Sequence, residues 1–276
     1  MVKMKFLLTL LSCILILLTG GAMAGQKNTL KNIKNVAPEK WEALSGKKIY
    51  FGHQSVGFNI IDGIKDVMSA DNRVKLNIVE LNEIGKLDAS GFYHSRIGSN
   101  VDPISKIEDF SRKMADGISG TADIAFFKFC FVDIGADTDV NKVFDHYKST
   151  MSRLKSKYPN TTFIHFTIPL GTTITTWKTK IKTLMGKKDI WEYDANIKKN
   201  EFNDLLTNYY AGKDPVFDIA YFESTYPDGK RSTFTKEGKS YFDLAPEYTY
   251  DDGHLNEKGR QWVAKHLLNF LAAAGL

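Results

Sequence analysis

Hydrophobic residues recur along this chain of 276 residues in two patterns that alternate from about residue 48 onward. Short apolar runs are typical of strands, whereas longer stretches with an apolar residue at every third or fourth position are typical of helices with one buried face. The expected strands are residues 48–51, 73–81, 123–134, 161–168 and 216–221. The expected helices are residues 38–44, 58–67, 103–114, 140–157, 195–210 and 257–274.

Strands that alternate with helices predict an α/β fold, a single doubly wound domain whose mainly parallel central sheet is flanked by helices. Residues 123–134 support a parallel sheet because they are apolar without alternation, as in a strand that helices cover on both faces. Ligands of such sheets bind outside the carboxyl ends of the strands. We expect this domain at residues 46–276, after a lead-in segment at residues 25–45.

Three stretches do not follow either pattern. Residues 82–100 are polar and rich in turn formers, which predicts a long loop. Residues 171–194 are rich in Thr, Lys and Trp and are expected to form a helical excursion over the surface. Residues 223–250 are polar and aromatic, and both a platform for stacking sugar rings and ordinary packing fit their composition.

The first 24 residues have the features of a secretory signal peptide. Lys3 and Lys5 precede an apolar run at residues 6–18, and Ala22-Met23-Ala24 forms an A-x-A cleavage site. We therefore expect an exported protein, periplasmic or secreted, without a stable membrane span after cleavage. Lipoprotein anchoring through Cys13 is the alternative, because the residues before it loosely match a processing box.

Charge and cysteine content narrow the function classes. The chain has 37 Lys and Arg against 32 Asp and Glu, and two of the lysines lie in the signal segment, so the exported form carries a net charge of about +3. That excess is too small to indicate a nucleic-acid partner. Cleavage leaves Cys130 alone, so no internal disulfide can form and the core must stabilise the fold.

A serine lies where the first strand passes into the first long helix. Ser55 follows a glycine turn at the end of residues 48–51, at or just before the first helical turn. Its hydroxyl could cap free backbone N–H groups, which is the common role of serine at this position. It could also attack a substrate while the same N–H groups stabilise an oxyanion.

A second cluster of polar residues directly precedes the last helix. His254 follows Asp251 by three residues, so one turn can place the carboxylate against the imidazole and fix its tautomer. The other ring nitrogen is then free to accept a proton from a serine, which is the arrangement that acyl transfer requires.

In order and spacing, these residues resemble the SGNH/GDSL hydrolase superfamily of exported α/β esterases over most of the mature chain. The resemblance implies that Ser55 is the nucleophile, His254 the general base and Asp251 the acid that orients it. It also implies that Gly98 matches the second-block glycine, whose backbone N–H binds the oxyanion. No cofactor is implied.

Two blocks depart from the pattern of the superfamily. The first reads Gly-His-Gln-Ser, closer to a Gly-Gln-Ser-Asn variant of some carbohydrate acetylesterases than to Gly-Asp-Ser. The third, normally Gly-x-Asn-Asp, reads Cys-Phe-Val-Asp at residues 130–133, so its asparagine donor is missing. Asn100, His53 or Gln54 could replace that donor. Loss of one oxyanion donor costs about a hundredfold to a thousandfold in rate.

A metal site is the competing interpretation of the histidines near Ser55. His53 and His254 with Asp251 and Asp252 would suit zinc by ligand type, but no close pair such as H-x-x-x-H supports it, and we expect no metal.

The sequence therefore predicts an exported serine esterase that removes acyl groups, with acetyl as the expected group, from a glycan or a small ester. A glycan O-acetyltransferase with the same acyl-serine is an alternative, because the sequence does not identify the acceptor. A catalytically inactive glycan-binding or assembly protein is another, supported by the missing asparagine.

Overall fold

The computed structural model describes residues 36–173 and 191–273. The compact unit begins at Pro38 and includes the helix α2 (Pro38–Ser45), whose Trp41 and Leu44 are buried. The signal segment, the lead-in up to residue 35 and residues 174–190 of the expected helical excursion lie outside the described residues.

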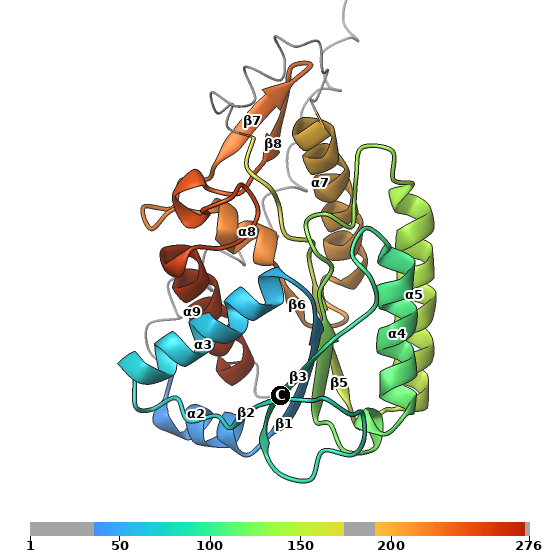
Figure 1. The fold of residues 1–276 in the computed structure, drawn as a ribbon, viewed down its shortest axis with the longest axis vertical. Helices are drawn as coiled ribbons and strands as arrows, with labels where there is room; N and C mark the ends of the chain where they lie inside the picture. The colour runs from blue at the N-terminus through green and yellow to red at the C-terminus, as the bar shows by residue number, and fades with distance from the viewer. Residues whose placement is uncertain (1–35, 174–190, 274–276) are drawn as a thin grey trace, which may run out of the picture. The chain divides into compact units, whose positions relative to one another are not determined.

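A sheet of six parallel strands forms the centre of this unit, in the order β2-β3-β1-β4-β5-β6, and confirms the predicted fold class (Figure 1). From β1 the chain passes to the edge strand β2, returns to β3 beside β1, and then runs outward on the other side through β4, β5 and β6. The strands are β1 (Lys48–His53), β2 (Ile78–Glu80), β3 (Gly91–Arg96), β4 (Ile124–Phe127), β5 (Thr162–Phe166) and β6 (Val216–Phe217).

Helices cover both faces of the sheet. Figure 1 shows α2, α3 and α9 on one side and α4, α5 and α7 on the other. Their bounds are α3 (Val56–Ala70), α4 (Pro103–Ala115), α5 (Val140–Lys157), α7 (Trp191–Tyr210) and α9 (Glu257–Ala273). Because both faces are covered, the inner strands are apolar on both sides, and β4 is buried at every position.

Aromatic rings stack across the middle of the sheet. Phe51 of β1 lies 5.0 Å from Phe126 of β4, ring centroid to centroid, and Phe126 lies 4.8 Å from Phe166 of β5 with nearly parallel planes. All three side chains are buried. Burial of such large rings stabilises the strands that carry the site, each by roughly 2–3 kcal/mol relative to exposure.

The structure corrects the prediction of a loop at residues 82–100. Residues 91–96 form β3, which pairs with both β1 and β2. The polar side chains of β3 led to the prediction of a loop, but in the structure they are buried against partners that lie far away in the sequence. The hydroxyl of Ser95 lies 2.8 Å from the hydroxyl of Tyr50, and the ring of His94 lies 3.0 Å from that of His53, measured between nitrogens.

Three expected strands are shorter than predicted, and the run at 73–81 is a strand only at β2. The run at 123–134 is a strand only as far as Phe127, after which the chain turns. The run at 216–221 is a strand only at β6, because Asp218 caps the short helix α8 (Ile219–Ser224) by accepting a hydrogen bond from the Tyr221 N–H at 3.0 Å. An apolar run alone did not reveal these ends.

The aromatic stretch at residues 223–250 forms a separate hairpin, β7 (Thr233–Lys236) with β8 (Lys239–Phe242), followed by a short 3-10 helix, η3 (Pro246–Tyr248). The rings of Phe234 and Tyr241 stack on each other with centroids 5.5 Å apart, and Tyr248 is buried. These rings therefore pack within the protein, while Tyr250 is exposed.

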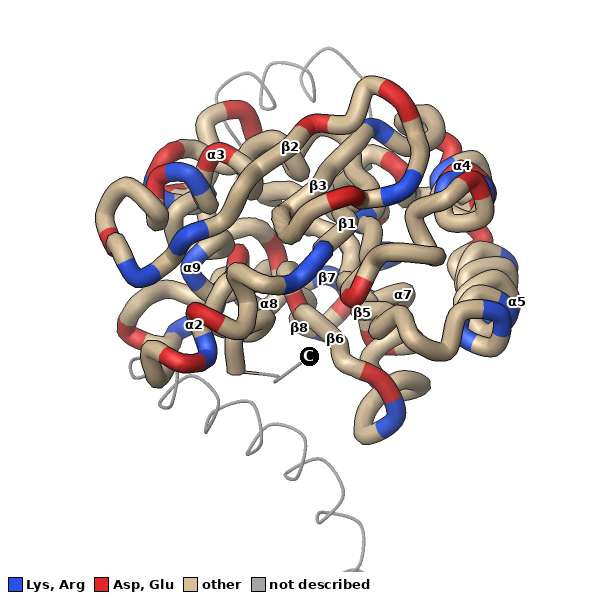
Figure 2. Tube along the Cα trace, turned by 90° about the horizontal axis from the view of Figure 1, so that it is seen from below, with Lys and Arg blue, Asp and Glu red and all other residues tan. Residues whose placement is uncertain are grey.

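Acidic and basic residues are interspersed along the tube in Figure 2, with no long stretch of one sign in that view. Within the described ranges, no helix combines the length and apolarity that crossing a membrane requires.

Candidate active site

Ser55 lies in the sharp turn between β1 and α3, at the carboxyl end of a central strand. Its φ of 46° is unusual for a residue other than glycine and is typical of strained turns at functional sites. Its side chain makes no capping hydrogen bond to α3. Instead, its Oγ is in hydrogen-bond contact with Nε2 of His254. The capping interpretation of Ser55 is therefore wrong, and the hydroxyl faces an imidazole.

The tightness of this turn depends on a glycine two residues further on. A Cβ on Gly57 would lie 2.3 Å from the ring of His53, so only glycine lets the first turn of α3 pack so closely against the end of β1. This close packing determines where the backbone of Ser55 emerges from the fold.

The loop before α9 supplies the other two side chains. Nδ1 of His254 lies 2.7 Å from Oδ2 of Asp251, and the backbone N–H of His254 donates to Oδ1 of the same carboxylate at 2.7 Å. Burial acts to raise the pKa of Asp251, but the hydrogen bonds from the backbone and ring of His254 outweigh it, so this pKa lies below its usual value. Asp251 is therefore a carboxylate at neutral pH.

The partners of the imidazole imply its tautomer. A carboxylate can only accept, so Nδ1 of His254 carries the proton toward Asp251 and Nε2 presents its lone pair to the Ser55 hydroxyl. This chain of hydroxyl, imidazole and carboxylate is the arrangement that activates a serine for attack on a carbonyl.

Packing between α3 and α9 brings the two parts of the site together. The side-chain oxygen of Asn59 accepts a hydrogen bond from the Leu255 N–H at 3.2 Å. Between the two helices themselves, Arg260 of α9 donates to Asp66 of α3 at 2.8 Å. Sequence inspection missed both pairs, since their members lie nearly 200 residues apart and neither pair forms a motif.

The site is open to solvent and flanked by aromatic rings. The side chains of His254 and Asp251 are 30% and 42% exposed. The ring of Phe131 stands perpendicular to the imidazole with centroids 5.4 Å apart, and the ring of Tyr250 lies nearly parallel to it at 6.0 Å. Tyr250 is 66% exposed, so its ring is available to a ligand next to His254.

The structure corrects the role considered for His53. This side chain is fully buried, and its Nε2 contacts His94. Burial and the neighbouring charge of Lys128 hold the pKa of His53 well below its usual range, so the ring is neutral. His53 is thus a core residue that neither lines the site nor joins Asp251, Asp252 and His254 in a metal centre. No group of three potential metal ligands occurs among the described residues.

Gln54 and Gly98 are also occupied by contacts within the protein. The amide Nε2 of Gln54 donates to the carbonyls of Ile97 and Gly98 at 3.2 and 2.8 Å, so it fastens the loop after β3 and is not a spare donor. The N–H of Gly98 donates to Oδ2 of Asp109 at 2.9 Å. In this structure Gly98 therefore does not offer the N–H that the resemblance implied.

The third block anchors a loop by means of its aspartate. Asp133 accepts hydrogen bonds from the N–H groups of Cys130 and Val101 and forms an ion pair with Lys106 at 2.6 Å, with both side chains fully buried. The buried role of Lys106 was not predicted from the sequence. Its place beside Ile107, on the apolar side of α4, was a signal that could have indicated a buried lysine. Lys128 is buried as well, and its Nζ donates to the Phe129 carbonyl at 3.1 Å.

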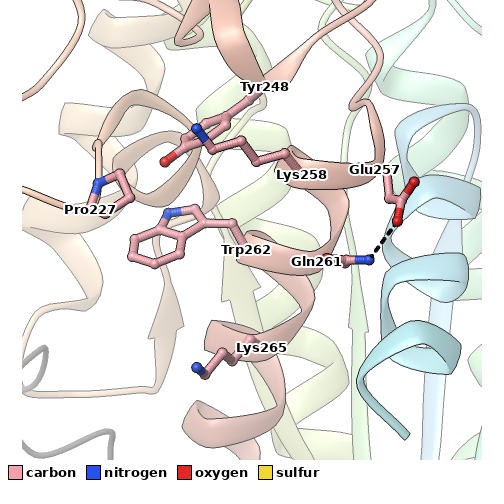
Figure 3. A pocket seen from close by; sticks show the side chains of 7 residues that line it. All are labelled: Pro227, Tyr248, Glu257, Lys258, Gln261, Trp262 and Lys265. Atoms are coloured by element: carbon pink, nitrogen blue, oxygen red, sulfur yellow. Dashed lines mark hydrogen bonds between the residues drawn. The ribbon is translucent and has the colours of Figure 1, made fainter. Parts of the chain in front are cut away.

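A hollow of about 450 Å³ lies elsewhere, along α9 (Figure 3). The close-up shows Lys258 beside the ring of Tyr248, above the indole of Trp262. Ser55, Asp251 and His254 do not line this hollow, so it is distinct from the chemical site. Its lining residues are Pro227, Tyr248, Glu257, Lys258, Gln261, Trp262 and Lys265.

This chain is similar to known proteins in its structure, but its sequence matches no known family. No protein-family model matches the chain, and no curated protein matches it. A structure from Streptococcus pneumonia, assigned as a platelet activating factor, is 16% identical, covers 91% of this chain and 99% of its own, and has a TM-score of 0.49.

Two other similar structures belong to proteins with lipolytic names. One, assigned as a G-D-S-L family lipolytic protein from Desulfitobacterium hafniense DCB-2, is 10% identical, with coverages of 81% and 99% and a TM-score of 0.47. The lipase/acylhydrolase from Enterococcus faecalis is 13% identical, with coverages of 83% and 96% and a TM-score of 0.47. Matches at this level of identity concern the fold alone, so the chemistry of this chain follows from its own site.

Proposed function

We propose that this protein is a serine esterase that cleaves acyl esters through an acyl-serine intermediate. The observation that carries the proposal is the continuous contact from Ser55 through His254 to Asp251, at the carboxyl end of a central parallel strand. Strained serine geometry, an imidazole in the required tautomer and an ionised carboxylate behind it are together what nucleophilic acyl transfer needs.

The first half of the reaction forms the acyl-enzyme. Oγ of Ser55 attacks the carbonyl carbon of the ester while Nε2 of His254 takes the hydroxyl proton, and the carbonyl oxygen becomes an oxyanion. When the intermediate collapses, the bond to the alcohol oxygen breaks and His254 gives its proton to that oxygen. Asp251 stays ionised and stabilises the imidazolium that exists between the two steps.

The second half releases the acid. His254 takes a proton from water, whose oxygen attacks the acyl carbon, and the bond to Oγ then breaks with return of the proton to Ser55. The partial exposure of His254 and Asp251 supports water as the acyl acceptor, because solvent can reach the base. Transfer to a sugar hydroxyl is the second candidate, and it would require an acceptor that displaces this water.

The substrate class follows from the leader and from the surroundings of the base. The signal-like residues 1–24 favour an exported enzyme, for which esters outside the cytoplasm are the available substrates. Exposed Tyr250 beside His254 suits an alcohol portion with a flat or ring-shaped apolar face, such as a sugar. An acetylated glycan fits both observations, whereas a purely binding role would leave the Ser55 and His254 contact without a purpose.

The test is turnover of p-nitrophenyl acetate and of acetylated oligosaccharides by the purified protein. Ser55→Ala should lower kcat by roughly 10⁴- to 10⁶-fold. Ser69→Ala, at the exposed far end of the same helix, is the matched control and should leave kcat unchanged. Equal turnover by the wild type and Ser55→Ala would remove the serine from the mechanism. Mass analysis with an added glycan acceptor distinguishes free acetate from a newly acetylated sugar.

A further inference from the structure

The loop between β3 and α4 has almost no free hydrogen-bond donors. The N–H of Ile97 donates to the His53 carbonyl at 3.1 Å, and the N–H of Gly98 donates to Asp109 at 2.9 Å. Those of Ser99 and Val101 donate to the Ser105 hydroxyl and the Asp133 carboxylate at 2.9 and 3.0 Å. Among the described residues, neither the backbone N–H nor the side-chain NH₂ of Asn100 has an acceptor.

The side chain of Asn100 is held in a defined orientation. Its Oδ1 accepts a hydrogen bond from Nζ of Lys106 at 2.9 Å, while the same ammonium is paired with Asp133. A lysine side chain can only donate, so the amide must turn its oxygen toward Lys106 and its Nδ2 away from it. The exposed Asn100 thus presents a fixed donor to solvent.

The backbone is strained at the residue that follows Asn100. Val101 has a φ of 68°, although its branched side chain disfavours the left-handed region, and it is 73% exposed. A residue persists in such a conformation only where its surroundings hold it, and strain of this kind clusters at functional sites. Here the Asp133 carboxylate holds the Val101 N–H, directly after Asn100.

The same loop lies beside the nucleophile. Gln54, the residue before Ser55, donates to the carbonyls of both Ile97 and Gly98, so residues 97–98 are fastened to the turn that carries the serine. The N–H of Ser55 itself has no acceptor among the described residues. The Ser55 N–H and a donor from this loop are therefore the candidates to bind the oxygen of an acyl group carried on Oγ.

We propose that Asn100 is the amide donor of the oxyanion hole, and that Lys106 is the positioning residue that orients it. This inference rests on the proposed esterase function. Asn100, from the loop after β3, would take the place of two donors that the superfamily pattern supplies. One is the N–H of Gly98, which donates to Asp109 here, and the other is the missing third-block asparagine. Nδ2 of Asn100 and the Ser55 N–H donate to the carbonyl oxygen as it gains negative charge during attack.

Substitution of Asn100 tests the donor directly. Asn100→Ala and the nearly isosteric Asn100→Asp should each lower kcat about 10²- to 10³-fold on p-nitrophenyl acetate, with KM changed less than about threefold. Affinity for a boronic acid, whose tetrahedral adduct with Ser55 carries an oxygen at the same position, should fall in parallel. Ser99→Ala, in the same loop, is the control and should leave both quantities unchanged. If Asn100→Ala keeps kcat within about threefold of the wild type, the assignment is wrong.

The role of Lys106 is tested by combining variants. Lys106→Met alone would leave the buried Asp133 carboxylate without a countercharge. It is therefore combined with Asp133→Asn, which removes that charge and keeps an acceptor for the Val101 N–H. If Lys106 acts through Asn100, this pair lowers kcat at least about tenfold in the wild type but less than about twofold in Asn100→Ala. Equal losses in both backgrounds would contradict the positioning role, since a purely structural effect does not depend on Asn100. Absence of Ser55-dependent turnover in the wild type would instead overturn the proposed function and, with it, this assignment.

Discussion

The side-chain oxygen of Asn59, on the first turn of α3, accepts a hydrogen bond from the backbone N–H of Leu255 at 3.2 Å. Ser55 begins the turn into this helix, and His254 directly precedes Leu255. The contact therefore ties the helix after Ser55 to the loop that carries His254, although 196 positions separate the two partners in sequence.

Loss of that contact should disturb the Ser55 and His254 geometry without removing either group. We expect Asn59→Ala to lower kcat about tenfold, because small displacements of reacting groups are costly, while KM changes little. Asn59→Asp keeps the acceptor oxygen and should retain most activity. Asp62→Ala, on the exposed side of α3, is the control for helix effects. Steady-state kinetics of the four proteins would contradict this role if Asn59→Ala matched the wild type.

The two adjacent aspartates before His254 should differ sharply in effect. Asp251→Asn would favour the wrong imidazole tautomer, so we expect kcat to fall about 10³- to 10⁴-fold with little change in stability. Asp252 is exposed, with a φ of 74° that asparagine also tolerates, so Asp252→Asn is a matched control that should keep full activity. Equal kcat values for the two variants would show that Asp251 does not orient His254.

Tyr250 should affect the alcohol part of the substrate. In the proposed mechanism His254 protonates the leaving oxygen, which places the group attached to that oxygen near the imidazole and its neighbour Tyr250. Tyr250→Ala should therefore lower kcat/KM about fivefold for acetylated sugars but not for ethyl acetate. Tyr209→Ala, an exposed tyrosine on α7, serves as the control. A similar loss on every ester would indicate instead that Tyr250 supports the imidazole itself.

His266 on α9 should make the fold sensitive to acid. Burial, with a smaller effect of Lys265, lowers the pKa of His266 from the usual 6.5 to about 4, and neither ring nitrogen has a partner among the described residues. Between these values the unfolded chain binds a proton that the folded protein does not. As far as His266 is concerned, the free energy of unfolding is therefore highest above pH 6.5. It decreases as the pH falls to about 4, by at most about 3 kcal/mol.

Replacement of this ring should remove that dependence. We expect His266→Leu to flatten the fall in Tm between pH 6.5 and 4, because no group at this position then takes up a proton on unfolding. Lys265→Ala, its exposed neighbour, should leave most of the slope in place. Thermal melts of the three proteins would contradict this account if the slope of His266→Leu equalled that of the wild type.

Local patterns were sufficient to predict the fold class and three side chains that the structure brings into contact. The helix expected at residues 140–157 is α5 with the same bounds, because its apolar spacing is regular and Asp139 caps it. Ser55, Asp251 and His254 were recognisable because each lies in a short motif at the edge of a regular element.

Features that depend on remote partners could not be predicted in this way. β3 appeared to be a loop because the partners that bury Ser95 and His94 lie more than 40 residues away. The Lys106 and Asp133 pair, which contacts Asn100 through Lys106, joins two different segments that lie 27 positions apart. The sequence around a polar residue does not show whether the fold will bring a hydrogen-bond or ion-pair partner to it.

The most direct test of the acyl-enzyme proposal is to treat the protein with a fluorophosphonate probe and locate the adduct by mass spectrometry. We expect one adduct, on Ser55, and labelling that is strongly reduced in His254→Ala. An absence of labelling, or an adduct on another serine with Ser55 unmodified, would contradict it.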